Sequence, residues 1–284
     1  MSITSSSMLV ELNMSVWTAN KVDRAATATV IDDNCAVNNA ARVHKNLMAG
    51  TTMRKDIADF AAACYTWHRS RTVPWADKGA RLLPTSLFLD YKTEANQRRD
   101  KFNQMVGDFI KEYPNLIQQA QANMGSLFSA SDYPSEEEVA SKFGFRMVFS
   151  PVPESNDFRL AVPAQELEEL RSQYEDSFKS RLADAMKEPW DRLHDMLQTM
   201  SAKLTDVEGV EEKKRYHETL ITNAQSLCSM LTHLNITQDP ELEKARVQME
   251  QAIFGIDIDD IKESPAVRAD VKSKLDAVLK QYEW

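Results

Sequence analysis

The densest group of side chains able to do chemistry lies in the run YTWHRSRTVPWADKGAR, residues 65–81. Arginine and lysine bind phosphates and tryptophan rings stack on bases, a combination typical of a surface for single-stranded nucleic acid. The same residues are typical of a helix terminus whose arginines bond carbonyl oxygens while the tryptophans fill a core, and we favour this second interpretation. The candidate nucleic-acid or partner surface consists of Trp67, Arg69, Arg71, Trp75, Lys78 and Arg81, extended by Arg146 and Arg159 from a predicted strand pair.

Cysteine and histidine spacing offers one candidate for a metal site. Cys64 and His68 stand four residues apart in a predicted helix, which places two ligands on one face. A zinc site needs a second pair, and neither Cys35 nor Cys228 has a histidine at the usual spacing. A buried cysteine beside a surface histidine is the favoured interpretation, and we expect no metal and no cofactor.

Three aspartates in GIDIDDI (Asp257, Asp259 and Asp260) are candidate ligands for a hard cation. A calcium loop alternates its acidic positions and then needs a glycine and a distal glutamate, and this order is missing. We therefore expect these aspartates to cap a short helix. The motifs GxSxG, HExxH, GxxxxGK[ST] and GxGxxG do not occur. A Ser or Cys–His–Asp set that meets only in the folded chain stays open, but we expect a non-enzyme without catalytic residues.

Composition favours a mainly α protein. The chain has 284 residues, of which 43% are hydrophobic, so a sizeable core can form. Only 7 residues are glycine and 13 are methionine. Glycine is thus at about a third of its usual ~7% share, which disfavours folds built from many tight turns.

The net charge and the cysteines indicate which partners and which cellular compartment to expect. The net charge is −9, so no general basic field attracts duplex nucleic acid. Three unpaired, widely spaced cysteines suit a reducing compartment. The first residues carry no basic segment followed by an apolar one, and no window approaches 18 uncharged apolar residues. We expect a cytoplasmic protein that does not contact a membrane.

One stretch, KFGFRMVFSPVPESNDFRLAVP (142–163), follows a strand pattern. Apolar residues alternate with polar ones and two prolines interrupt the run, which predicts a β-hairpin over 143–162. Because two strands alone are marginal in water, MLVELNMSVW (8–17) is expected to supply a third. The predicted three-stranded antiparallel sheet has one apolar face formed by Phe143, Phe145, Met147 and Phe149.

The elements before that hairpin are predicted to be helical. Helices are expected over about 18–48 and 52–71, followed by a loop over 72–84. A long helix from Thr85 should break or kink at Pro114. Ser135 is the expected N-cap of a short acidic helix.

Long helices dominate the second half. From Ala164 apolar residues recur at steps of three and four in a coiled-coil-like stripe, and a second helix over 210–235 has the same spacing. The two predict an antiparallel helical hairpin, and Asp239 and Ser264 should cap two further helices. We expect an N-terminal helical region over 1–163 that contains the small sheet and a second region over 164–284 that contains the long helical hairpin and the C-terminal helices. The two regions are expected to form one continuous fold. The candidate helical interface consists of Leu167, Leu170, Tyr174, Phe178 and Leu182.

Three segments carry a resemblance: VPWADKGARLLPTSLFLDY, DYPSEEEVASKFGFRMVFSPVPESNDFRL and LNITQDPELEKARVQME. Together they resemble an uncharacterised family of phage and integrative-element proteins, a domain of unknown function. The resemblance covers nearly the whole chain and implies a mobile-element, bacterial host-cell context. It further implies a MoxR-like AAA+ ATPase or a recombination protein as partner. It assigns no chemistry to any residue.

The sequence therefore favours a non-catalytic helical interaction or scaffold protein of phage or mobile-element origin. Self-association or an AAA+ ATPase partner would use the helical hairpin and the small sheet. The alternative is a single-stranded nucleic-acid-binding accessory in phage recombination or replication, using the basic and aromatic residues named first. A hydrolase whose site assembles only on folding is a third hypothesis.

Overall fold

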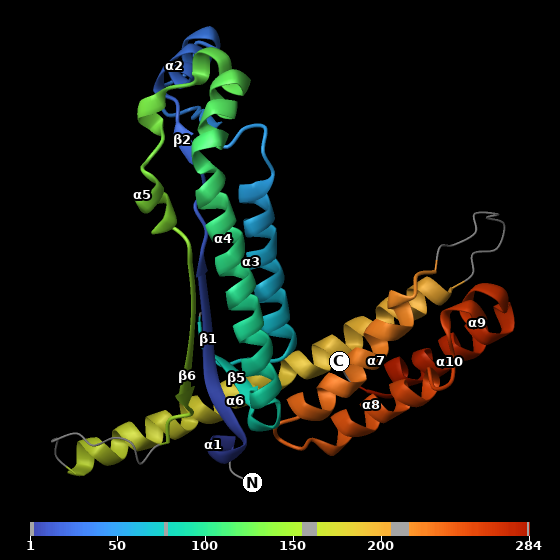
Figure 1. Cartoon of the computed structure of the whole chain (residues 1–284). Helices are drawn as coiled ribbons and strands as arrows, with labels where there is room; N and C mark the ends of the chain where they lie inside the picture. The colour runs from blue at the N-terminus through green and yellow to red at the C-terminus, as the bar shows by residue number, and fades with distance from the viewer. Residues whose placement is uncertain (1–2, 77–78, 155–163, 206–215, 283) are drawn as a thin grey trace. The chain divides into compact units, whose positions relative to one another are not determined.

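The computed structural model describes residues 3–76, 79–154, 164–205, 216–282 and 284. It is 68% helical with a small antiparallel sheet, which confirms the mainly α class (Figure 1). The chain forms two compact units. Unit 1 comprises residues 1–11, 69–91 and 148–284, and unit 2 comprises residues 12–68 and 92–147. Neither unit begins or ends at residue 163.

The strands are β1 (Ser7–Ser15), β2 (Asn20–Val22), β3 (His44–Asn46), β4 (Val73–Pro74), β5 (Arg81–Pro84) and β6 (Gly144–Pro151). The α-helices are α1 (Ile3–Ser6), α2 (Arg24–Asp33), α3 (Met53–Ser70), α4 (Phe88–Met124), α5 (Glu136–Ala140), α6 (Ala164–Leu204), α7 (Thr219–Leu234), α8 (Pro240–Ala252), α9 (Ile258–Glu263) and α10 (Pro265–Gln281). The described residues also form the 3₁₀ turns η1 (Thr85–Leu87), η2 (Gly125–Leu127) and η3 (Ala130–Asp132).

Among the described residues, the main sheet has four strands in the order β4-β5-β1-β6 rather than the predicted three. The N-terminal strand does lie beside β6, as expected. It also pairs antiparallel with β5, with Leu9 opposite Leu82, and β5 pairs antiparallel with β4. Both β4 and β5 fall in the predicted loop over 72–84, so that prediction was wrong. The predicted return strand of the hairpin, after residue 154, lies outside the described residues.

Unit 1 is built around α6, α7, α8 and α10 (Figure 1). These helices share one apolar core. The predicted caps are confirmed. Asp239 accepts a hydrogen bond from the backbone N–H of Glu241 at 2.9 Å, and Ser264 accepts one from that of Val267 at 3.3 Å. A second cluster joins the sheet to α6 and consists of Leu9, Val73, Trp75, Leu82, Val152, Ala185 and Leu234.

Unit 2 is organised around α3 and α4 (Figure 1). Both helices contribute side chains to a core rich in aromatic residues. Trp17 packs edge-on against Phe109 and Tyr113, at ring-centroid distances of 6.3 and 5.8 Å. The helix α4 continues through Pro114 as one element, so the predicted break does not occur. The predicted cap is confirmed: Ser135 accepts from the backbone N–H of Glu138.

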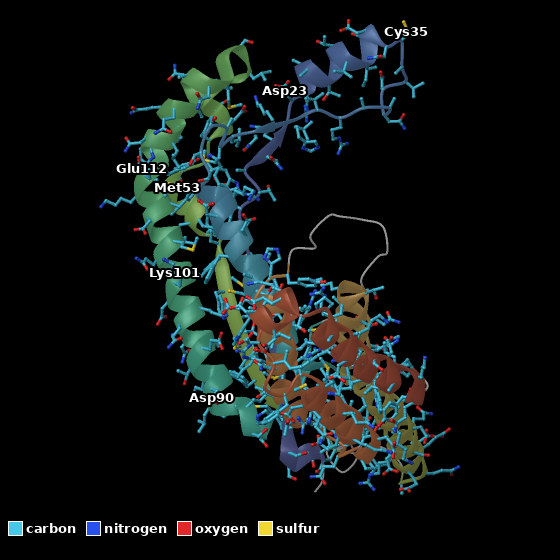
Figure 2. All side chains as sticks on the ribbon, turned by 90° about the vertical axis from the view of Figure 1, so that its right-hand side faces the viewer. Asp23, Cys35, Met53, Asp90, Lys101 and Glu112 are labelled. Carbon is cyan, nitrogen blue, oxygen red and sulfur yellow. The ribbon has the colours of Figure 1, made fainter. Side chains whose placement is uncertain are left out.

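The predicted helix over 18–48 was too long. The chain instead forms β2, α2 and β3, with β2 and β3 paired antiparallel. Asp23 begins α2 by accepting from the backbone N–H of Ala26 at 2.9 Å, and Cys35 follows its end with a φ of +47°. Figure 2 shows Asp23 and Cys35 at opposite ends of this helix. A left-handed residue at the end of a helix terminates it, whatever the alanine content of the sequence.

Candidate interaction surfaces

An open groove lies between α6 and α7 in unit 1 and has a volume of about 350 Å³. Side chains three, four or seven residues apart share one face of a helix, and this spacing brings the α6 residues to one wall. The groove is lined by Arg192, Asp195, Met196, Thr199 and Lys203 from α6 and by Thr219, Leu220, Asn223 and Leu227 from α7.

The floor and the rim of this groove differ in chemistry. Met196, Leu220 and Leu227 provide apolar surface, whereas Asp195 and Lys203 are exposed charged residues. An apolar floor inside a polar rim suits the side chain of a partner protein, since burial of that side chain removes both apolar surfaces from water. The lining therefore combines apolar surface with exposed charged groups.

One wall of the groove is held rigidly by Arg192. Its guanidinium donates to the carbonyl oxygens of Arg69 at 2.6 Å, Ser70 at 3.0 Å and Thr72 at 2.9 Å. It also donates to Glu188 Oε1 at 2.5 Å. These carbonyls lie at and just beyond the C-terminus of α3, where a cation is favoured by the helix dipole. A wall fixed by four such bonds presents a preformed surface.

The two tryptophans of the basic and aromatic run are buried, which disfavours the alternative in which their rings stack on bases. Trp67 is 5% exposed, and the guanidinium of Arg98 lies over its ring at 4.7 Å. Trp75 is 6% exposed and packs edge-on against Phe178 at 5.1 Å. Both indoles fill core positions, as the favoured interpretation of this run predicts.

The arginines of that run differ in exposure and in their partners. Arg81 donates to Thr72 and to Glu188 Oε2, the latter at 2.8 Å, and burial lowers the pKa of its guanidinium. Arg71 is half-buried, while Arg69 and Arg146 are exposed, one in each unit. Lys78 and Arg159 lie outside the described residues.

The candidate helical interface on α6 is only partly open. Leu167 and Leu170 are half-buried. The Tyr174 hydroxyl donates to the carbonyl of Pro153 at 2.5 Å. Phe178 and Leu182 pack against the cluster that contains Trp75, so these two belong to the core of unit 1 rather than to an external seam.

The residues considered as metal ligands are buried or cap a helix. Burial raises the pKa of the Cys64 thiol, and His68 is only 3% exposed, so the expected surface histidine was wrong. Asp257 accepts from the backbone N–H of Asp259 and Asp260 and thereby caps α9, as predicted. Among the described residues, no group of three or more His, Cys, Asp or Glu side chains is arranged to hold a metal.

Two features escaped the sequence analysis. The Ser86 hydroxyl lies 3.0 Å from His233 Nδ1, a hydroxyl–imidazole pair brought together from residues 147 positions apart. Neither residue lines the α6–α7 groove. Phe254 is 83% exposed on the turn between α8 and α9. The dipeptide Phe254-Gly255 directly after a helix is the local signal that could have drawn attention to this turn.

A second, more open hollow of about 540 Å³ occurs in unit 2 at the start of α3. Met53 and Glu112 contribute to it from α3 and α4, and Figure 2 shows both near the same level of the two helices. Its other lining residues are mostly polar or charged: Thr51, Asp108, Lys111, Leu116 and Gln119. The α6–α7 groove, with its larger share of apolar residues, is the better protein-binding candidate.

Across the described part of the chain, no helix is both long and apolar enough to cross a bilayer. Comparison with protein-family models, with curated proteins and with solved structures finds no match.

Proposed function

We propose that this chain is a non-catalytic helical scaffold that self-associates through the exposed surface of its α6–α7 helical hairpin. The observation that carries the proposal is the groove with Met196, Leu220 and Leu227 on its floor. Such a surface is stabilised when a protein side chain covers it, because apolar area buried from water contributes about 25 cal/mol per Å².

A mobile-element origin and a cytoplasmic, AAA+ ATPase-associated role form the wider part of the proposal. The three quoted segments that resemble the phage and integrative-element family support it. A scaffold that assembles copies of itself would present repeated binding sites to such an ATPase.

The test fills the groove without disturbing the core. Asn223 is exposed and lines the groove, so Asn223→Trp places an indole over the apolar floor. Gln225 is exposed on the same helix but does not line the groove, and Gln225→Trp is the matched control. Sedimentation velocity on the full chain, from about 1 to about 300 μM, measures association within the usual range of specific contacts.

The wild type and Gln225→Trp are expected to gain mass with concentration, whereas Asn223→Trp stays monomeric. A wild-type protein that remains monomeric throughout contradicts the proposal. Equal association of both tryptophan variants contradicts the assignment of the groove.

The non-catalytic part of the proposal is tested at the hydroxyl–imidazole pair. Ser86 and His233 have the contact distance of a nucleophile and its base. We expect no more hydrolysis of p-nitrophenyl esters by the wild type than by Ser86→Ala. Turnover that disappears in Ser86→Ala would instead establish a hydrolase.

A further inference from the structure

The paired strands β2 and β3 form a two-stranded ribbon in unit 2, and one face of this ribbon is bound within the unit. Lys21 lies opposite Lys45, and both ammonium groups bond the carboxylate of Asp132, that of Lys21 at 2.7 Å. Lys45 Nζ also lies 3.6 Å from Asp23 Oδ2. The two ammonium groups and the two carboxylates cancel in charge. This face is therefore neutral and turned toward η3.

The opposite face of the ribbon is exposed to solvent. Val22 lies opposite His44, one position beyond the lysine pair, and Asn20 lies opposite Asn46, one position before it. Because side chains alternate between the two faces of a strand, these four share the face away from the lysines. All four are exposed, and none is acidic.

Two arginines without a partner extend the ribbon at one end, which Figure 2 marks by the label of Asp23. The backbone N–H of Asp23 donates to the carbonyl oxygen of Val43 at 3.0 Å, which continues the pairing by one position. Arg24 and Arg42 come next on the two segments, and both are exposed. Among the described residues, neither guanidinium forms an ion pair or a hydrogen bond. Both charges are therefore available to an anion.

This part of the chain has a local excess of positive charge although the protein as a whole is acidic. The net charge of the protein is −9, yet residues 34–55 contain four basic residues and no acidic one. Complementary charge selects a partner and like charge rejects one. The outward face of the ribbon therefore suits an anionic partner, which the rest of the protein surface would repel.

The shape of the ribbon favours duplex DNA among anionic partners. Paired strands lie about 4.8 Å apart, and a two-stranded ribbon fits the major groove of B-form DNA, which is about 12 Å wide. Arginine binds phosphates, and asparagine binds the edge of adenine. The Asn20 amide is exposed on the outward face. An acidic peptide or an anionic membrane would meet the charge of the arginines but offers no groove for the ribbon.

We propose that the β2–β3 ribbon binds double-stranded DNA, with Arg24 and Arg42 on phosphates and the face of Val22 and His44 turned into the major groove. This contact goes beyond the proposed scaffold function and does not depend on self-association. Two arginines supply two phosphate contacts, and the acidic remainder of the protein adds none. The dissociation constant is accordingly expected in the range of non-specific binding, about 10⁻⁴–10⁻⁶ M.

Salt dependence tests the proposal. Fluorescence anisotropy measures binding of the full chain to a labelled duplex of about 20 base pairs, between about 20 and about 200 mM salt. Two phosphate contacts predict that a plot of log Kobs against log salt has a slope of about −1.8. Arg24→Ala and Arg42→Ala should each weaken binding about 3- to 10-fold at low salt and make the slope shallower by about 1. Arg42→Lys, which keeps the charge, should retain the slope of the wild type.

The matched control removes an equal charge elsewhere in unit 2. Arg99 is an exposed arginine of α4, and Arg99→Ala is expected to bind DNA as the wild type does. Because Arg24 and Arg42 are exposed and unpaired, their replacement should change stability by less than about 0.5 kcal/mol. Melting temperatures verify that each variant is folded.

The outcomes separate this proposal from self-association. A wild type that does not bind the duplex at the lowest salt overturns the proposal. Equal binding by Arg24→Ala, Arg42→Ala and the wild type, or equal weakening by Arg99→Ala, overturns the assignment to the ribbon. Oligo(dT), polyglutamate or anionic vesicles bound as tightly as the duplex overturn the role of the groove. Sedimentation of Arg24→Ala and Arg42→Ala should match that of the wild type, so each proposal is refuted by a different measurement.

Discussion

Replacement of Glu188 by alanine should destabilise unit 1 more than the loss of an exposed ion pair would. The Glu188 carboxylate accepts from Arg81 Nη2 at 2.8 Å and from Arg192 Nη2 at 2.5 Å. It thereby links β5 to α6 and holds Arg192, which in turn binds the carbonyl oxygens at the C-terminal end of α3. The side chains of Arg81, Glu188 and Arg192 are only 17%, 27% and 18% exposed.

The magnitude follows from the bonds lost and the water that can replace them. Each hydrogen bond to a charged group contributes about 1.5–3 kcal/mol net. Breaking a fully buried ion pair costs about 3–5 kcal/mol. Both arginines keep bonds to Thr72, and the three side chains are partly exposed to solvent. We therefore expect Glu188→Ala to lower the free energy of unfolding by about 2–3 kcal/mol. Glu188→Gln, which retains one acceptor oxygen, should lose about half as much.

Scanning calorimetry is the suitable assay because the chain has two compact units and need not unfold in a single step. At about 2–4 °C per kcal/mol, Glu188→Ala should lower the melting temperature of the unit 1 transition by about 4–12 °C. Asp184 is the matched control, since it bonds Lys187 at 2.7 Å on the same helix but is 64% exposed. Asp184→Ala should change stability by less than about 0.5 kcal/mol. Equal melting temperatures for the two alanine variants would refute the reasoning.

Three further outcomes are expected. In Gly50→Ala the added Cβ would lie 2.1 Å from Asn123 Nδ2, and the φ of +90° at this position disfavours any side chain. The variant should lower the free energy of unfolding, measured in urea, by about 1–3 kcal/mol. No loss of stability, or full recovery in the double variant with Asn123→Ala, would contradict the argument from backbone strain. Hydrogen bonds from Lys21 and Lys45 lower the pKa of Asp132, so its contribution to stability is present above about pH 4 and is lost as the pH falls through the lowered value. Asp132→Asn should accordingly reduce the drop in melting temperature between pH 6 and pH 3, and an unchanged drop would count against the network. Because Trp67 and Trp75 are buried, a fluorescent oligo(dT) should show no salt-dependent binding in anisotropy titrations, and binding that Arg69→Ala weakens would revive the nucleic-acid alternative.

Local signals in the sequence predicted the features that depend on neighbouring residues. Ser135, Asp239 and Ser264 cap helices where expected, because an N-cap is decided within about four residues. The alternation after residue 143 likewise predicted β6. The strands β4 and β5 were missed because they are two and four residues long and are stabilised by partners distant in the sequence. Alanine content over 18–48 indicated a helix, but the cap at Asp23 and the left-handed Cys35 restrict α2 to ten residues.

The candidate surfaces could be predicted only in part. The spacing of apolar residues in α6 and α7 predicted that the two helices pack together. Which of their side chains remain exposed depends on α8 and α10, which complete the same core. Met196 and Leu227 carry the same apolar character as their buried neighbours, so sequence alone does not separate groove from core. Arg81 was assigned to a surface because arginine is usually exposed, whereas a carboxylate 107 residues away binds it in unit 1.

The interleaving of the two units along the chain has a consequence for synthesis on the ribosome. Unit 2 is complete once residue 147 has emerged, whereas unit 1 needs residues 1–11 as well as the helices that end near residue 281. Domains generally fold as units during translation, the N-terminal ones first. Here residues 1–11 are synthesised first but can join the core of unit 1 only after unit 2 and the helices α6, α7, α8 and α10 have been synthesised. We therefore expect unit 2 to fold before unit 1, although unit 1 begins first in the sequence. A chain truncated after residue 147 is expected to retain unit 2 and to leave residues 1–11 without the rest of the core of unit 1.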